Sequence, residues 1–119
     1  MRTIIAGSRK GATLDIVEDA MKKAPFPISV VISGTARGVD TLGEDVAHKY
    51  ILPIEQYPSE WNKYGKSAGY KRNEIMADNA EALVAIWDGK SKGTKHMIDI
   101  AKRKGLLVYI HYMGESNDI

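Results

Sequence analysis

Three glycine-bearing loops carry residue types that bind phosphate and other anions. They read Gly7-Ser8-Arg9, Gly34-Thr35-Ala36-Arg37-Gly38, and Gly89 through Gly93 followed by Thr94. Glycine lets backbone N–H groups approach a phosphate, and each loop enters a predicted helix whose N-terminus carries partial positive charge. No loop matches GxxxxGK[ST] or GxGxxG, so neither a P-loop ATPase nor a conventional dinucleotide site is predicted. The loops instead predict a nucleotide or another phosphorylated ligand.

A charged residue on a predicted helix adds to this pattern. Helical spacing places on one face the residues Ala68, Arg72, Ile75, Met76 and Asn79. A charged side chain in an apolar stripe is rarely buried unpaired. We therefore expect Arg72 to contact either a bound anion or a carboxylate such as Asp40 or Asp88.

The stretch from residue 61 to residue 71 interleaves aromatic and basic side chains. Its members are Trp61, Lys63, Tyr64, Lys66, Tyr70 and Lys71. Such a stretch could stack nucleic-acid bases and contact phosphates. The alternative is that Trp61 packs against the domain and fixes the connection in place.

The histidines indicate no catalytic or metal centre. His48 and His111 are predicted to face solvent, and His96 has no partner at catalytic spacing. The sequence also lacks HxH, HExxH and GxSxG, so neither a metal hydrolase nor a serine triad is predicted, and no metal site is expected.

Apolar runs and amphipathic stretches alternate along the chain and form the elements that must position these loops. The predicted strands cover 3–6, 28–33, 52–57, 81–87 and 106–110, and the predicted helices cover 13–23, 39 to about 50, a segment ending near 79, and 94–104. This alternation predicts an α/β fold, a three-layer Rossmann-like sandwich with a mainly parallel five-stranded sheet in the order 3-2-1-4-5. The loops after strands 1, 2 and 4 would then meet at the carboxyl edge of the sheet, where such folds bind ligands.

Composition sets outer bounds on the function. The 119 residues are 44% hydrophobic and 27% charged, with a formal net charge of +2, so overall charge alone does not indicate nucleic acid. The chain has no cysteine, which excludes disulfides, thiolate nucleophiles and cysteine-ligated metals. The N-terminal apolar run is too short for a signal peptide, and no segment approaches the roughly 20 apolar residues of a membrane span. We expect a cytoplasmic protein, in the host cytoplasm if a phage encodes it, with no membrane partner.

Three motifs resemble one known superfamily. "SGTARGVDTLGEDVA", "WNKYGKSAGYKRNEIM" and "WDGKSKGTKHMI" are together similar to the SLOG superfamily of Rossmann-like domains, which includes the LOG and DprA proteins, and most of all to its small stand-alone YspA-like branch. The resemblance spans nearly the whole chain and implies a nucleotide-derived ligand at the carboxyl edge of the sheet. It places the family's "GGARGxD" motif on Gly34 to Asp40, with Ser33 before a single glycine, and its "RN" pair on Arg72 and Asn73.

One departure from the family pattern bears on catalysis. LOG enzymes carry PGGxGTxxE after the fourth strand, where the glutamate supports removal of a nucleobase. Here Gly93-Thr94 match, but Met97 takes the place of the glutamate, and a thioether can neither accept a proton nor stabilise an oxocarbenium-like centre. LOG-type chemistry is therefore not expected at this position, and Asp88 or Asp40 could act as acid or nucleophile in its stead.

These observations lead to one leading function and two alternatives. The leading interpretation is a sensor, carrier or sequestering domain that binds a nucleotide or nucleotide-derived ligand. The alternatives are an N-glycosidase or phosphoribohydrolase acting on nucleoside monophosphates, and a DprA-like protein that binds single-stranded DNA. We expect one domain over 1–110, a polar tail over 111–119, and a homodimer, as is common among SLOG relatives. The predicted ligand-binding residues are Gly7, Ser8, Arg9, Gly34, Thr35, Arg37, Gly38, Asp40, Arg72, Asn73, Asp88, Gly89, Ser91, Gly93 and Thr94.

Overall fold

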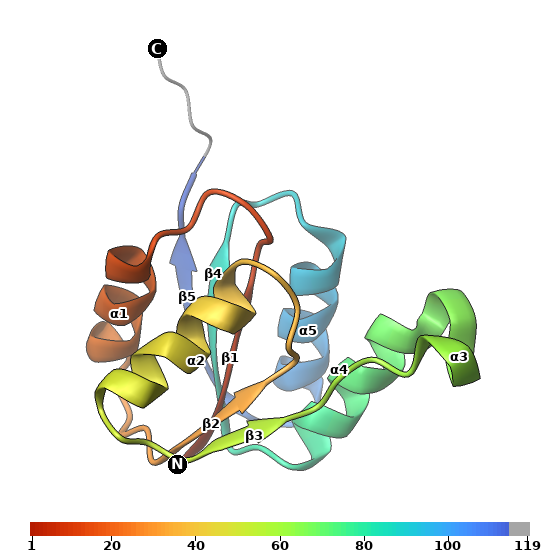
Figure 1. Cartoon of the computed structure of the whole chain (residues 1–119), viewed down its shortest axis with the longest axis horizontal. Coiled ribbons are helices and arrows are strands. Elements are labelled where there is room, and N and C mark those ends of the chain that lie inside the picture. The colour runs from red at the N-terminus through yellow and green to blue at the C-terminus, as the bar shows by residue number, and fades with distance from the viewer. Residues whose placement is uncertain (115–119) are drawn as a thin grey trace.

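The computed structural model, which describes residues 1–114, is a three-layer α/β sandwich (Figure 1). All five strands are parallel, and they are ordered β3-β2-β1-β4-β5. The strands are β1 (Arg2–Gly7), β2 (Val30–Ser33), β3 (Ile54–Gln56), β4 (Ala82–Trp87) and β5 (Leu107–Tyr112). The helices are α1 (Leu14–Lys23), α2 (Val39–Lys49), the short α3 (Trp61–Tyr64), α4 (Ala68–Asp78) and α5 (Lys92–Arg103). The predicted fold class and strand order are confirmed.

The central strands are covered on both faces. Ile5 of β1 packs in a cluster with residues of α1 and α2, whereas its neighbours Ile4 and Ala6 pack in a second cluster with residues of α4 and α5. Successive strand residues point to opposite faces, so a strand between two helical layers needs apolar residues at every position. This explains the uninterrupted apolar sequences of β1 and β4.

Several element boundaries differ from those predicted. β2 begins at Val30 rather than residue 28, because Pro25 and Pro27 keep the preceding segment irregular. The connection before α4 contains α3 and a 3-10 turn (Gly65–Ser67) rather than a plain loop. At the other end, β5 continues through Tyr112, two residues further than predicted. The rest of the predicted polar tail is 113–119, of which 115–119 lie outside the described residues.

The buried face of α4 also differs from the prediction. Ile75 is 42% exposed and Asn79 is exposed, whereas Asn73 and Ala77 are buried with Ala68 and Met76. The helix is therefore turned by about one residue from the predicted face, and this rotation brings a polar side chain, Asn73, into the contact with α5.

Within residues 1–114, no helix is long and apolar enough to span a bilayer.

Candidate functional site

The predicted loops after β1 and β4 and the start of α2 meet at the carboxyl edge of the sheet. Ser8 links them through three hydrogen bonds. Its N–H donates to the Ile86 carbonyl (3.1 Å), its carbonyl accepts from the Val39 N–H (3.2 Å), and its hydroxyl accepts from the Asp88 N–H (3.1 Å). Because Ser8 is only 2% exposed, these bonds fix the three segments against one another in a buried position.

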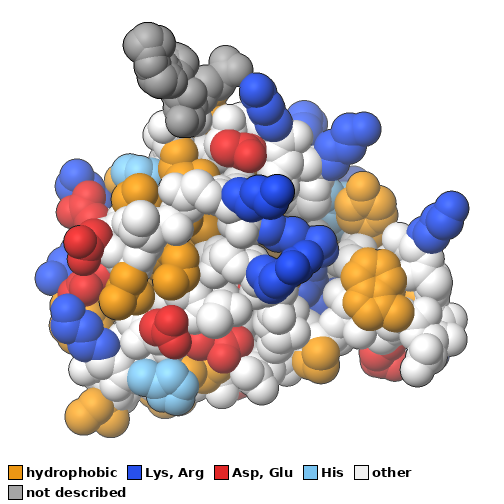
Figure 2. Space-filling view, turned by 45° about the horizontal axis from the view of Figure 1, so that its top comes forward, with side chains coloured by type: hydrophobic (Ala, Val, Ile, Leu, Met, Phe, Trp, Pro, Cys, Tyr) orange, Lys and Arg blue, Asp and Glu red, His pale blue; other side chains and the backbone are white. Residues whose placement is uncertain are grey.

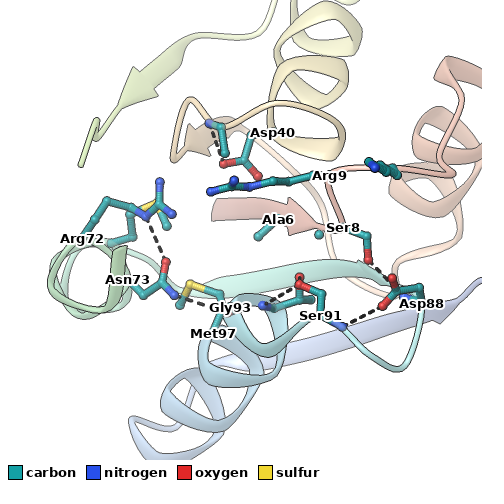
Figure 3. A pocket seen from close by; sticks show the side chains of 15 residues that line it. Ala6, Ser8, Arg9, Asp40, Arg72, Asn73, Asp88, Ser91, Gly93 and Met97 are labelled. Carbon is teal, nitrogen blue, oxygen red and sulfur yellow. Dashed lines mark hydrogen bonds between the residues drawn. The ribbon is translucent and has the colours of Figure 1, made fainter. Parts of the chain in front are cut away.

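A cavity of about 400 Å³ opens between these loops and α4. Ten of the fifteen predicted ligand-binding residues line it: Gly7, Ser8, Arg9, Asp40, Arg72, Asn73, Asp88, Ser91, Gly93 and Thr94. Figure 3 shows side chains from β1, α2, α4 and α5 around this one space. Residues that the sequence analysis did not select also line it, namely Ala6, Lys10, Ala36, Met76 and Met97. Lys10 follows directly on the first predicted loop, and Met97 stands where the family pattern has its glutamate.

The other five predicted residues do not line the cavity. They are Gly34, Thr35, Arg37, Gly38 and Gly89. Arg37 is exposed in the loop that precedes α2. Gly34 serves the site indirectly, because a Cβ added there would lie 2.2 Å from Nη1 of Arg72. Glycine at this position thus leaves room for the guanidinium to lie against the backbone.

Arg72 is held in place by neutral partners. Its Nε–H donates to Oδ1 of Asn73 (3.0 Å), and its Nη1 donates to the Gly34 carbonyl. It forms no ion pair with any carboxylate of residues 1–114; neither Asp40 nor Asp88, the two predicted partners, is bonded to it. A guanidinium has five N–H donors, so two anchoring bonds leave three donors for other groups.

A second guanidinium lies near the first. Arg9 extends across the cavity toward Arg72 (Figure 3). Burial lowers the pKa of Arg72, the charge of Asp40 opposes that shift, and the nearby charge of Arg9 adds to it. Two cations that approach each other without a bonded carboxylate create a local excess of positive charge. This arrangement favours an anion between them.

Asp40 is the carboxylate that faces these cations. It is 5% exposed, and its Oδ2 accepts from the Ala36 N–H (3.1 Å). Burial raises its pKa to about 6, against the opposing effects of that hydrogen bond and of the Arg72 and Arg9 charges. Asp40 therefore becomes neutral under mildly acidic conditions, which would increase the positive charge of the cavity.

Replacing Asp40 tests this assignment. A raised pKa in the folded state means that Asp40 contributes most to stability at low pH and that this contribution is lost as pH rises through about 6. We expect Asp40→Asn to be more stable than the wild type by about 1–3 kcal/mol at pH 8, with the difference shrinking below pH 6 and vanishing only below the ordinary carboxyl pKa of 3.8. Thermal unfolding from about pH 3.5 to 8 measures it, with the exposed Asp45→Asn of the same helix as control. A difference between Asp40→Asn and wild type that did not change with pH would contradict the assignment.

Asp88 has a different role. Its Oδ1 accepts from the N–H groups of Lys90 and Ser91 (both 2.8 Å), and these two hydrogen bonds lower its pKa. The carboxylate stabilises the turn before α5. In α5, Oγ of Ser91 accepts from the Thr94 N–H (3.4 Å) and so caps the helix. The N–H groups of Lys92 and Gly93 precede the first intrahelical hydrogen bond, so the positive end of this helix lies at the rim of the cavity.

The floor of the cavity is apolar. Ala6, Met76 and Met97 line it, and all three side chains are at least 90% buried. The cavity thus combines a cationic rim with an apolar floor, an arrangement suited to a ligand that has both an anionic group and a flat or apolar part.

The aromatic stretch and the histidines differ in part from what the sequence predicted. Trp61 is 56% exposed and Tyr70 is 46% exposed, so Trp61 is not packed into the domain. His96 has two neighbours: its Nδ1 lies 3.1 Å from Nδ2 of Asn73, and its ring packs at a tilt against Tyr70, with the ring centroids 4.5 Å apart. His48 is exposed as predicted, whereas His111 is half-buried in β5.

Comparisons with known proteins give one full-length relative and one shared fold. The gene 61 protein of Mycobacterium phage D29 is 30% identical over 117 residues, which cover 90% of this chain and 93% of that protein. A second match is to the uncharacterized SPbeta prophage-derived protein YoqJ of Bacillus subtilis, which is 48% identical over 33 residues. These residues are 28% of this chain and 19% of that protein. No family model matches the chain.

Among solved structures, DNA processing protein A (DprA) from Streptococcus pneumoniae superposes with a TM-score of 0.74 at 18% sequence identity. The match covers 92% of this chain but only 49% of the DprA chain, so the chain spans about half the length of that protein. At this identity the likeness establishes the fold, which is the Rossmann-like α/β fold found in DprA.

Proposed function

The chain belongs to the same family as the gene 61 protein of Mycobacterium phage D29, and we propose that it is a nucleotide-binding domain that acts as a sensor, carrier or sequestering protein. The ligand is a nucleotide or nucleotide derivative. Its phosphate lies between Arg72 and Arg9, and its base or ribose lies on the apolar floor of the cavity. We further propose that the chain is a single SLOG-type domain of the YspA-like branch.

The unpaired Arg72 is the observation that carries this proposal. A half-buried guanidinium with two neutral anchors and three remaining donors, at the lining of a cavity, is preorganised for an anion. A structural role alone would be better served by a bonded carboxylate, and Arg72 pairs with none of those in residues 1–114. Asp40 lies near enough to influence Arg72 but is bonded to a backbone N–H instead.

The surrounding charges support the same assignment. Arg9 and Lys10 add two cations, and the start of α5 adds unpaired backbone donors opposite Arg72. Phosphate is commonly bound by such a combination of guanidinium and helix N-terminus. Figure 2 shows Lys and Arg side chains gathered over this edge of the molecule.

Isothermal titration with inorganic phosphate, AMP, ADP and ADP-ribose tests the proposal. We expect at least one nucleotide to bind more tightly than phosphate alone, because the apolar floor adds contacts that phosphate cannot make. If all four failed to bind at millimolar concentration, the proposal would be wrong. Chromatography of the same mixtures for free adenine would distinguish binding from cleavage.

The enzymatic alternative has less support. Met97, buried in the cavity floor, provides no acid or base, and Oδ1 of Asp88 already accepts two backbone N–H groups. Asp40 is the remaining candidate, because its pKa of about 6 would let it act as a proton donor. A catalytic role for the chain would therefore depend on this one residue.

Single-stranded DNA is the second candidate, favoured by the exposure of Trp61. The short helix α3 precedes α4 and projects beyond the N-terminal end of that helix as an arm (Figure 1). This arm carries Trp61 together with Lys63. Figure 2 shows an exposed hydrophobic surface on this arm beside the basic region of the cavity. A tryptophan that is 56% exposed beside lysines is suited to base stacking with phosphate contacts. The solved structure with the same fold is a DNA processing protein.

We expect Trp61→Ala to weaken binding of a single-stranded oligonucleotide roughly 5- to 30-fold, the equivalent of about 1–2 kcal/mol of stacking. Leu107→Ala is the matched control, because Leu107 is 49% exposed at the opposite edge of the sheet. Gel shifts at two salt concentrations measure both variants, and binding must weaken as salt rises if phosphates are contacted. Equal affinities for Trp61→Ala and wild type would exclude this arm as a DNA-binding surface.

Two further expectations accompany the proposal. We propose that the protein functions in the cytoplasm of a bacterial host, in keeping with its phage relative. We also propose a homodimer. In a domain with so small a sheet, the outer faces of the helices stay exposed, and a second copy would cover some of them.

A further inference from the structure

Asn73 connects the proposed anion site to a histidine outside it. Its side chain is 5% exposed and fully hydrogen-bonded. Oδ1 accepts from Nε–H of Arg72 (3.0 Å), while Nδ2 donates to the Gly93 carbonyl (3.4 Å) and lies 3.1 Å from Nδ1 of His96. The reverse orientation of the amide would place its NH₂ group against the Arg72 N–H, donor against donor. The orientation of Asn73 is therefore set by its partners.

This orientation determines the state of His96. Because Nδ2 of Asn73 can only donate, Nδ1 of His96 must accept, so the ring is neutral with its proton on Nε2. The ring is held in this position by Tyr70, whose centroid lies 4.5 Å away at an interplanar angle of 53°. His96 and Tyr70 thus support Asn73 from the side opposite Arg72.

We propose that His96 is a positioning residue for Arg72, acting through Asn73, and that it does so only while Nδ1 is unprotonated. The inference rests on the proposed function, since it assigns His96 to the regulation of the same site. A proton on Nδ1 would turn the acceptor into a donor and oppose the Asn73 NH₂. Asn73 would then have to rotate, and Arg72 would lose the acceptor that orients its Nε–H.

The surroundings of His96 place its titration on the acidic side of the ordinary histidine range. Glu74 and Tyr70 face it from α4, and Asp99 and Arg103 from its own helix. Burial lowers the pKa of His96, the charges of Glu74 and Asp99 raise it, and that of Arg103 lowers it. The ring is therefore neutral at pH 7.5 and becomes protonated only in more acidic solution.

Two substitutions separate hydrogen bonding from titration. His96→Asn places an oxygen acceptor at the position of Nδ1 and does not titrate, whereas His96→Leu removes the acceptor. With AMP as the probe at pH 7.5, we expect His96→Asn to bind within 2-fold of wild type and His96→Leu to bind about 10-fold more weakly. On stepwise acidification from pH 7.5 to pH 5, the dissociation constant of the wild type should rise relative to that of His96→Asn, by about 5-fold once Nδ1 is protonated. Asp40 is present in both proteins, so its own titration cancels in this ratio.

A ligand-free measurement keeps this inference distinct from the proposed function. NMR can follow the hydrogen exchange of Nε–H of Arg72 without any ligand. At pH 7.5 this exchange should be about 10-fold faster in His96→Leu than in the wild type. On acidification it should become about 10-fold faster in the wild type than in His96→Asn. The exposed His48→Leu is the control and should change nothing. If these exchange effects appear but AMP, ADP and ADP-ribose do not bind, the positioning role holds and the proposed function fails. If Arg72 exchange and AMP affinity are the same in His96→Leu, His96→Asn and wild type at both pH values, the inference is overturned.

Discussion

Gly7→Ala is expected to destabilise the protein by about 3 kcal/mol or more. The added methyl group would clash with backbone atoms, which cannot move aside as a side chain can, so the cost exceeds that of an ordinary overpacked core. The last residue of β1 lies where β1, β4 and α2 meet. A Cβ at this position would come within 2.1 Å of the Ile86 carbonyl oxygen and 2.8 Å of Cγ2 of Val39. Gly7 pairs with Ile86 in the β1–β4 register, so relief would require these central strands to separate.

The matched control is a glycine in open space. Gly69 lies in α4, and a Cβ there would meet no atom within 4 Å. Gly69→Ala should therefore stabilise the protein, by about 0.5–1 kcal/mol from helix propensity. Urea unfolding measures both variants, with the midpoint expected to fall for Gly7→Ala and to rise for Gly69→Ala. A wild-type midpoint for Gly7→Ala would mean that the edge of the sheet is not packed as described.

Arg72→Ala should reduce nucleotide affinity by about 100-fold, equivalent to about 3 kcal/mol for the loss of a desolvated, charge-assisted contact. The three N–H donors that its anchors leave over would be lost together. Arg72→Lys keeps the charge but not the planar fork, so we expect an intermediate loss of about 10-fold. Isothermal titration with AMP gives both values.

Arg103→Ala is the control for the change in net charge. Arg103 is exposed at the last turn of α5, whereas the cavity lies at the first turn of that helix. We expect its affinity for AMP to stay within 3-fold of wild type. Equal losses in Arg72→Ala and Arg103→Ala would mean that AMP is attracted by overall charge rather than bound by Arg72.

The fold could be predicted because its signals are local. Uninterrupted apolar runs identified the strands that are buried on both faces. Glycine loops, each joining an apolar run to the next amphipathic stretch, identified the edge of the sheet where the loops meet. The register of α4 could not be predicted in the same way. Its sequence, AGYKRNEIMAD, is polar around most of its circumference, so two neighbouring faces are nearly equally suited to burial. The buried face carries Asn73, whose partners in α5 are distant in sequence.

The candidate site shows the same division between local and long-range information. Arg9, Arg72 and the start of α5 were identified from residue type and position. The contact between Asn73 and His96 was missed, because the two residues are 23 positions apart and meet only when α4 packs on α5. The exposure of Trp61 was also not evident from the sequence, since an aromatic residue in a polar connection can either pack or protrude.

The central claim is that a phosphate group binds between Arg72, Arg9 and the first turn of α5. A crystal structure of the protein with AMP tests this most directly. We expect the AMP phosphate within hydrogen-bonding distance of the Arg72 guanidinium and the adenosine against Met76 and Met97. AMP bound with its phosphate on another surface, or a cavity left without AMP at a concentration that saturates binding in solution, would contradict the claim.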